Sequence, residues 1–74
     1  MLGEKALDCL ELTSLPILSA ERGALLEQLA DRYSPKAVIS KLEQLADKGL
    51  IEYGISPLFG WLTEAGAAAL AARG

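Results

Sequence analysis

The sequence predicts a mainly α-helical domain that carries one small β-hairpin. The first observation is an amphipathic stretch over residues 34–48, which opens with a capping serine and a proline and ends at Gly49. The second is the apolar segment 50–62, which the turn signal Ser56-Pro57 divides into predicted strands over 50–55 and 59–62. The third is helical spacing of apolar residues before and after these segments. A helix and a hairpin therefore follow one another in the chain, with further helices on either side.

Length and charge limit the possible functions. The chain has 74 residues, enough for one domain over 1–74 with a modest core. Half of the residues are apolar, so a surface for self-association or for a partner is expected. The formal net charge is −3 and the pI is about 4.7. This acidic balance argues against the large basic footprint of a typical nucleic-acid-binding domain, although it leaves room for a local basic patch.

Catalytic chemistry has little support in the sequence. The chain has no histidine, the commonest general base and metal ligand, and its carboxylates are scattered singly. Cys9 is the single cysteine, and its spacing predicts a small buried hydrophobic residue in a reducing compartment. Metal-ligand spacings and glycine-rich phosphate loops do not occur. We therefore expect a protein that is not an enzyme and that uses no metal and no cofactor.

Targeting signals do not stand out either. No apolar segment approaches the length of a membrane span, and the first five residues are not followed by the apolar core of a signal peptide. The expected location is the cytoplasm, with no attachment to a membrane.

The first predicted helix covers residues 1–13 and is apolar on more than one face. Leu7 and Leu12 fall outside the stripe that its other apolar residues form. Two interpretations are open: the helix is buried between its neighbours, or it packs against a second copy of the chain. Pro16 breaks the helical pattern, and the apolar residues 15–18 suggest a short strand that would join the hairpin as its third strand.

The second and the last predicted helices both begin at a hydroxyl side chain. The second covers 19–33, with Ser19 as its N-cap. The last covers 63–72, is rich in alanine, and has Thr63 as its N-cap. The predicted buried stripe of the second helix comprises Leu26, Leu29, Ala30 and Tyr33, with Leu25 beside them.

The third predicted helix, over 34–48, has the clearest boundaries. Ser34 is its N-cap, and Pro35 occupies the first helical position, where its missing N–H is harmless. Gly49 is expected to adopt the left-handed conformation that ends a helix. Only a short turn separates this helix from the preceding one, which is the helix-turn-helix arrangement.

A resemblance rests on several short segments in one order. They are Leu26-Glu27-Gln28-Leu29-Ala30, Ser34-Pro35-Lys36-Ala37-Val38, Leu42-Glu43-Gln44-Leu45, Lys48-Gly49-Leu50-Ile51 and Leu62-Thr63-Glu64-Ala65-Gly66, followed by Leu70. From about residue 25 to residue 70 the chain thus resembles the winged helix-turn-helix regulators of the MarR and PadR type. The resemblance implies a winged helix-turn-helix fold, with 34–48 as the recognition helix and 50–62 as the wing. It also implies a bacterial or phage transcriptional regulator that binds double-stranded DNA as a homodimer.

The third helix supplies the residues expected to contact DNA. Its apolar positions cluster on one side, and lysines and small polar residues lie opposite. Lysines suit phosphates, and hydroxyl and amide groups suit base edges. Glu43 and Asp47 border the same side, so an ordinary solvated helix face is the competing interpretation. The expected contact residues are Ser34, Lys36, Ser40, Lys41, Gln44 and Lys48.

The amino-acid composition of the predicted hairpin differs from that of DNA-binding wings. Segment 52–61 contains no basic residue and holds three of the four aromatic residues of the chain. An alternative function is therefore a protein–protein interaction module, such as a phage or mobile-element regulator or inhibitor, that uses its apolar wing. The competing interpretation is that Ile55 and the last two aromatic residues cover the core. The expected protein-interface residues are Tyr53, Leu58, Phe59 and Trp61.

Overall fold

The computed structural model describes residues 2–73. Met1, which the sequence places in the first helix, and Gly74, which it places in the domain, lie outside the described residues. The described part is mainly helical and has a small two-stranded antiparallel sheet. None of its helices is both long and apolar enough to cross a bilayer. The elements are α1 (Glu4–Ser14), α2 (Ala20–Arg32), α3 (Pro35–Asp47), β1 (Ile51–Glu52), the 3₁₀ turn η1 (Pro57–Phe59), β2 (Trp61–Leu62) and α4 (Glu64–Ala71).

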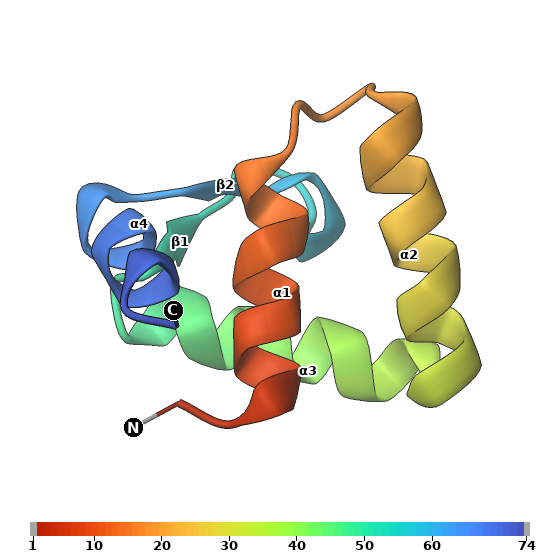
Figure 1. Ribbon diagram of the computed structural model, residues 1–74, viewed down its shortest axis with the longest axis horizontal. Helices are drawn as coiled ribbons and strands as arrows, with labels where there is room; N and C mark the ends of the chain where they lie inside the picture. Colours follow the sequence, from red (N-terminus) through yellow and green to blue (C-terminus); the bar gives the residue numbers. More distant parts are fainter. Residues whose placement is uncertain (1, 74) are drawn as a thin grey trace.

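Helix α1 lies at the centre of the molecule. It packs against α2, α3, α4 and β2, and Figure 1 shows α3 running across beneath α1 and α2. The wide apolar surface of α1 is thus used largely within the chain, which favours the first of the two interpretations of this helix. The side chains of the core come mostly from α1 and α3: Ala6, Cys9, Leu10, Leu12, Leu29, Val38, Leu42, Leu45 and Ile51.

Hydroxyl caps and a glycine define the helix ends, as the sequence predicts. The Ser19 and Ser34 hydroxyls accept hydrogen bonds from backbone N–H groups three residues later, at 3.1 Å in both cases. Gly49 has a positive φ of 77°. The Leu50 N–H donates to the Leu45 carbonyl at 2.9 Å, and the Gly49 N–H donates to the preceding turn, which completes a Schellman end for α3.

The hairpin is shorter than the sequence predicts. Strands over 50–55 and 59–62 were expected, but β1 and β2 pair over only two residues each, Ile51 with Leu62 and Glu52 with Trp61. Residues 57–59 instead form η1, because Pro57 has no N–H for a ladder and the Ser56 hydroxyl caps the turn by accepting from Leu58 N at 3.3 Å. The third strand expected at 15–18 is also wrong, since this segment forms a turn.

A buried carboxylate joins three helices. Asp8 of α1 is 5% exposed, and its two oxygens accept from Arg32 at the end of α2 and from Arg73 after α4, both at 3.4 Å. The sequence did not predict this role, because neighbouring apolar residues dominate the pattern of α1. The network fixes the ends of α2 and α4 relative to the central helix.

Gly66 allows α4 to approach the end of α3. The Thr63 hydroxyl donates to the Gly49 carbonyl at 2.7 Å and accepts from the Gly66 N–H at 3.0 Å. Gly66 itself is buried, and a Cβ atom at this position would overlap the carbonyl oxygen of Leu50. The Leu-Thr-Glu-x-Gly segment is therefore a structural joint between the hairpin and α4.

Replacing Gly66 by alanine should lower the free energy of unfolding by about 2 kcal/mol or more, because the Leu50 backbone must move to make room. The measurement is urea unfolding followed by circular dichroism. Gly23→Ala is the matched control, since a Cβ atom there meets nothing within 4 Å. That control should stabilise α2 by roughly 0.5–1 kcal/mol. Equal stability of Gly66→Ala and the natural chain would contradict the steric explanation.

Candidate functional site

The outward face of α3 carries a row of polar side chains spaced by four residues. The row consists of Lys36, Ser40, Gln44 and Lys48, and all four side chains are exposed. Residues four apart on a helix lie one above the other, so the row forms a continuous line along the axis. Its opposite face is buried through Val38, Leu42 and Leu45, as the sequence predicts. The row, hereafter the polar row, brings together four of the six expected DNA contacts.

The other two expected contacts have partners within the chain. Lys41 is half-buried, and its Nζ donates to Oε1 of Gln44 at 3.0 Å. Ser34 is exposed, but its hydroxyl accepts the capping hydrogen bond from Ala37 N. Lys41 thus adds positive charge to the edge of the polar row, whereas Ser34 mainly determines where α3 begins.

An acidic row lies beside the polar row. Glu43 and Asp47 are both exposed, and they continue the line of Ile39 along the helix, one and two steps of four residues further on. By helical geometry, this row separates the polar row from the side of α3 that meets η1. Positive charge therefore lies on one flank of α3, and negative charge lies on the flank nearer the hairpin.

The four residues expected to form a protein interface do not point the same way. Leu58 is half-buried and packs against the core, and Tyr53 is also half-buried. Phe59 is 57% exposed and Trp61 is 45% exposed. Ile55, which the core-lid interpretation placed inside, is fully exposed. Ile55, Phe59 and Trp61 therefore do not form a core lid, and the hairpin presents them to solvent.

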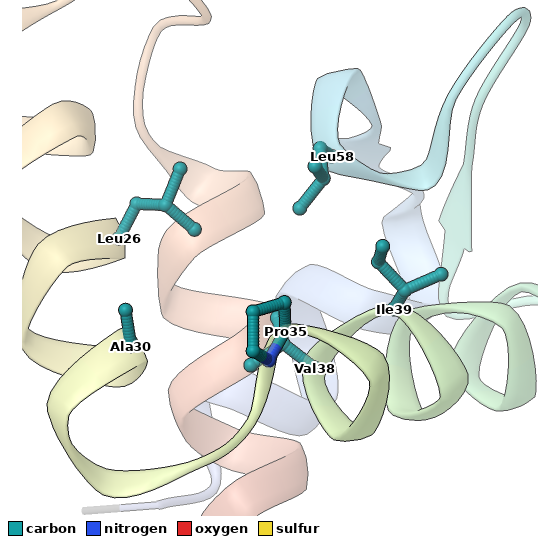
Figure 2. A pocket seen from close by; sticks show the side chains of 6 residues that line it. All are labelled: Leu26, Ala30, Pro35, Val38, Ile39 and Leu58. Atoms are coloured by element: carbon teal, nitrogen blue, oxygen red, sulfur yellow. The ribbon is translucent and has the colours of Figure 1, made fainter.

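An apolar groove runs between α2, the first half of α3 and η1. Figure 2 shows its deeper part, where Leu26 of α2 faces Leu58 of η1 across a space that lies above Pro35 and Val38. This part has a volume of about 220 Å³ and only apolar lining residues: Leu26, Ala30, Pro35, Val38, Ile39 and Leu58. A second part, of about 290 Å³, shares two of these residues and extends to Ile17, Leu18 and Phe59. Ala30, predicted to be buried, is instead an exposed wall of the groove, because none of the described elements covers this edge of α2.

A buried arginine connects the two walls of the groove at one end. Arg22 is 4% exposed, and its guanidinium donates to three carbonyl oxygens: Leu15 at 3.0 Å, Leu58 at 2.8 Å and Gly60 at 2.9 Å. Between residues 2 and 73 no carboxylate forms an ion pair with it. Burial lowers the pKa of the Arg22 guanidinium. Three carbonyl dipoles thus compensate a charge that has left water, and they tie α2 to η1 and to the α1–α2 turn.

Sequence reasoning missed Arg22, although a signal exists. Arg22 lies four residues before Leu26 and seven before Leu29, on the apolar stripe of α2. A cation at such a position must have buried partners or reach solvent. The sequence does not show that its acceptors lie 36 and 38 residues further along the chain.

Reactive groups are few in the described residues. Cys9 is completely buried, and burial, with a smaller contribution from Asp8, raises the pKa of its thiol to about 11. The thiol is therefore protonated at neutral pH, which agrees with the predicted core role. Within residues 2–73, no three His, Cys, Asp or Glu side chains gather closely enough to hold a metal ion.

Comparison with protein-family models, curated proteins and solved structures gave no match.

Arg22→Met should lower the free energy of unfolding by roughly 2–4 kcal/mol, because it leaves buried carbonyls without a donor. Hydrogen exchange should show the largest loss of protection in the hairpin. Arg32→Met is the matched control: this side chain is 56% exposed and its partner Asp8 retains Arg73, so the expected cost is about 0.5 kcal/mol. Equal costs for the two variants would show that the three carbonyl contacts do not fix the hairpin.

Proposed function

We propose that the chain is a small winged helix-turn-helix protein that binds double-stranded DNA through α3 and acts as a transcriptional regulator. The observation that carries this proposal is the polar row, exposed along the second helix of a helix-turn-helix pair. Only Tyr33 and Ser34 separate α2 from α3, and the hairpin and α4 follow in the order that the resemblance implies. An exposed helix of this size fits the major groove of B-form DNA.

The polar row divides naturally into two kinds of contact. Lys36 and Lys48 lie at opposite ends of α3 and suit the two phosphate strands that border a groove. Ser40 and Gln44 lie between them and suit base edges, with Lys41 holding the Gln44 amide in place. The acidic row borders this surface on the hairpin side, so its charge would oppose the contact with phosphates.

Weak contact by one helix makes two copies useful. The hairpin offers no cation to a phosphate, so a single domain has few electrostatic contacts. A homodimer would join two half-sites and multiply their contributions. A shallow hollow where α1 meets α4 is a suitable contact surface, since half-buried Leu2, Leu7 and Ala69 border it along with Ala72 and Arg73.

Removing positive charge from the polar row should weaken DNA binding. The double change Lys36→Gln and Lys48→Gln is expected to lower affinity for a mixed-sequence duplex roughly tenfold or more at low salt, and to reduce the slope of log K against log salt by about 0.9 for each phosphate that the variant no longer neutralises. Fluorescence anisotropy over a salt series measures both quantities. Glu43→Gln with Asp47→Asn should instead strengthen binding, because it removes charge that repels phosphates.

Lys5→Gln is the control for net charge, because Lys5 lies on α1 above the Tyr33 ring, 5.1 Å from its centroid, and not on the polar row. It should change affinity much less than a single change at Lys36. No salt-dependent binding by the natural chain, even at low salt, would sink the DNA-binding proposal. An equal decrease in affinity with Lys5→Gln would rule out the assignment to α3.

The α1–α4 hollow should carry the dimer contact. Sedimentation equilibrium is expected to show a monomer–dimer equilibrium in the natural chain and mainly monomer in Ala72→Lys, since the added charge would be buried in the contact. Ala67→Lys places the same charge on an exposed position of α4 that does not border the hollow, and it should leave the equilibrium unchanged. A natural chain that remains monomeric at millimolar concentration would contradict this contact.

A further inference from the structure

We infer that the groove between α2, α3 and η1 is a docking site for a basic amphipathic helix of a partner protein. This second binding surface lies on the opposite flank of α3 from the polar row, and it does not depend on whether α3 binds DNA. The inference rests on the shape of the groove, on its apolar lining and on the charges along its rims.

The groove has the dimensions of a short helical ligand. It follows α2 from Ser19 to Ala30, a length of roughly 16 Å or three helical turns. Its two parts meet at Leu26 and Leu58, so two successive apolar side chains of a docked helix would each fill one part. In the second part of the groove, Leu18 is 93% exposed and Phe59 is 57% exposed, so both offer apolar surface to a docked side chain.

The rims of the groove are mainly acidic. On α2, Glu27 and Asp31 are exposed and form the row next to Ala30. On α3, Glu43 is exposed one turn beyond Ile39, and Lys36, one turn before it, is the cation of this rim. These rims thus carry three carboxylates and one ammonium group. Charge complementarity therefore favours a partner helix with lysine or arginine on either side of its apolar stripe.

Arg22 does not reverse this preference. It lines the end of the groove near the α1–α2 turn, but it is buried and all three of its contacts are backbone carbonyls of the same chain. Its guanidinium is therefore directed into the protein, whereas the carboxylates on the rims are exposed. A docked helix would carry its basic residues toward Glu27 and Glu43.

Other occupants suit the groove less well. A second copy of this chain would place its own acidic rims against these, and each copy carries a net charge of −3. An anionic membrane would meet the same repulsion. A small molecule would find no polar side chain in the deeper part to orient it, since all six lining residues there are apolar.

The test uses the full chain and a synthetic peptide of leucine and lysine, with leucines spaced to form one apolar stripe over about four helical turns. Calorimetry measures the affinity, and methyl NMR spectra locate the contact. The peptide should bind one-to-one and shift the methyl signals of Leu26, Ile39 and Leu58. A leucine–glutamate peptide of the same pattern should not bind.

Two lysine substitutions on α2 distinguish binding in the groove from a general effect of the net charge of the protein. Ala30→Lys places a cation on the groove wall. It should lower the affinity for the leucine–lysine peptide roughly tenfold or more, equivalent to about 1.4 kcal/mol of binding free energy. Ala24→Lys makes the same charge change at an exposed position outside the lining, so its effect should stay below about twofold. Both positions are exposed helix surface, so both variants should fold.

Three results would overturn the inference. The first is no binding of the leucine–lysine peptide, or methyl shifts that lie outside the groove. The second is an equal decrease in peptide affinity for Ala30→Lys and Ala24→Lys. That result would show that the peptide binds through general attraction between opposite charges and not in the groove. The third is a dimer of the natural chain that Ala30→Lys dissociates, which would make a second copy the occupant.

Discussion

The arrangement of this small protein depends on one buried cation and three carbonyl groups. The Arg22 guanidinium reaches the Leu15 carbonyl in the α1–α2 turn and the Leu58 and Gly60 carbonyls of the hairpin. It is placed for this by the Ser19 cap that starts α2. Moving an unpaired charge out of water costs several kcal/mol, so each of these hydrogen bonds offsets part of that cost. A sheet of two residue pairs has too few hydrogen bonds to define a hairpin by itself. The guanidinium supplies the connection that a longer ladder would otherwise provide.

The charges on α3 divide its exposed surface into two parts. Lysine and polar side chains face one way, the groove faces the other, and Glu43 and Asp47 stand between them. A polyanion and a basic helix would thus be guided to different flanks of the same helix. The proposed DNA surface and the inferred docking surface meet at Lys36, which belongs to the polar row and to a rim of the groove. Binding at one surface would therefore change the affinity of the other surface for its ligand, because both use the Lys36 side chain.

The sequence predicted local features well and non-local ones poorly. Helix ends at Ser19, Ser34, Gly49 and Thr63 could be found because caps and a left-handed glycine are decided by neighbouring residues. The predicted strand lengths and the predicted third strand were wrong, since the Leu58 and Gly60 carbonyls accept from a helix far away in the sequence, and the Leu15 carbonyl accepts from the same arginine. The polar row followed from helical periodicity. The groove did not, because it requires knowing that η1 stands opposite α2 across the first half of α3.

The attachment points of the hairpin leave its tip with few contacts. Gly54 and Ile55 lie between the β1–β2 pairing and the Ser56 cap of η1, both are exposed, and the side chain of Ile55 is fully exposed. Lengthening a surface loop costs little, with each doubling of its length adding only about 0.6 kcal/mol. Insertions at this tip would leave Arg22 and its acceptors undisturbed. The tip is therefore the place where the chain can be lengthened, and acquire new contacts, while the described helices keep their arrangement.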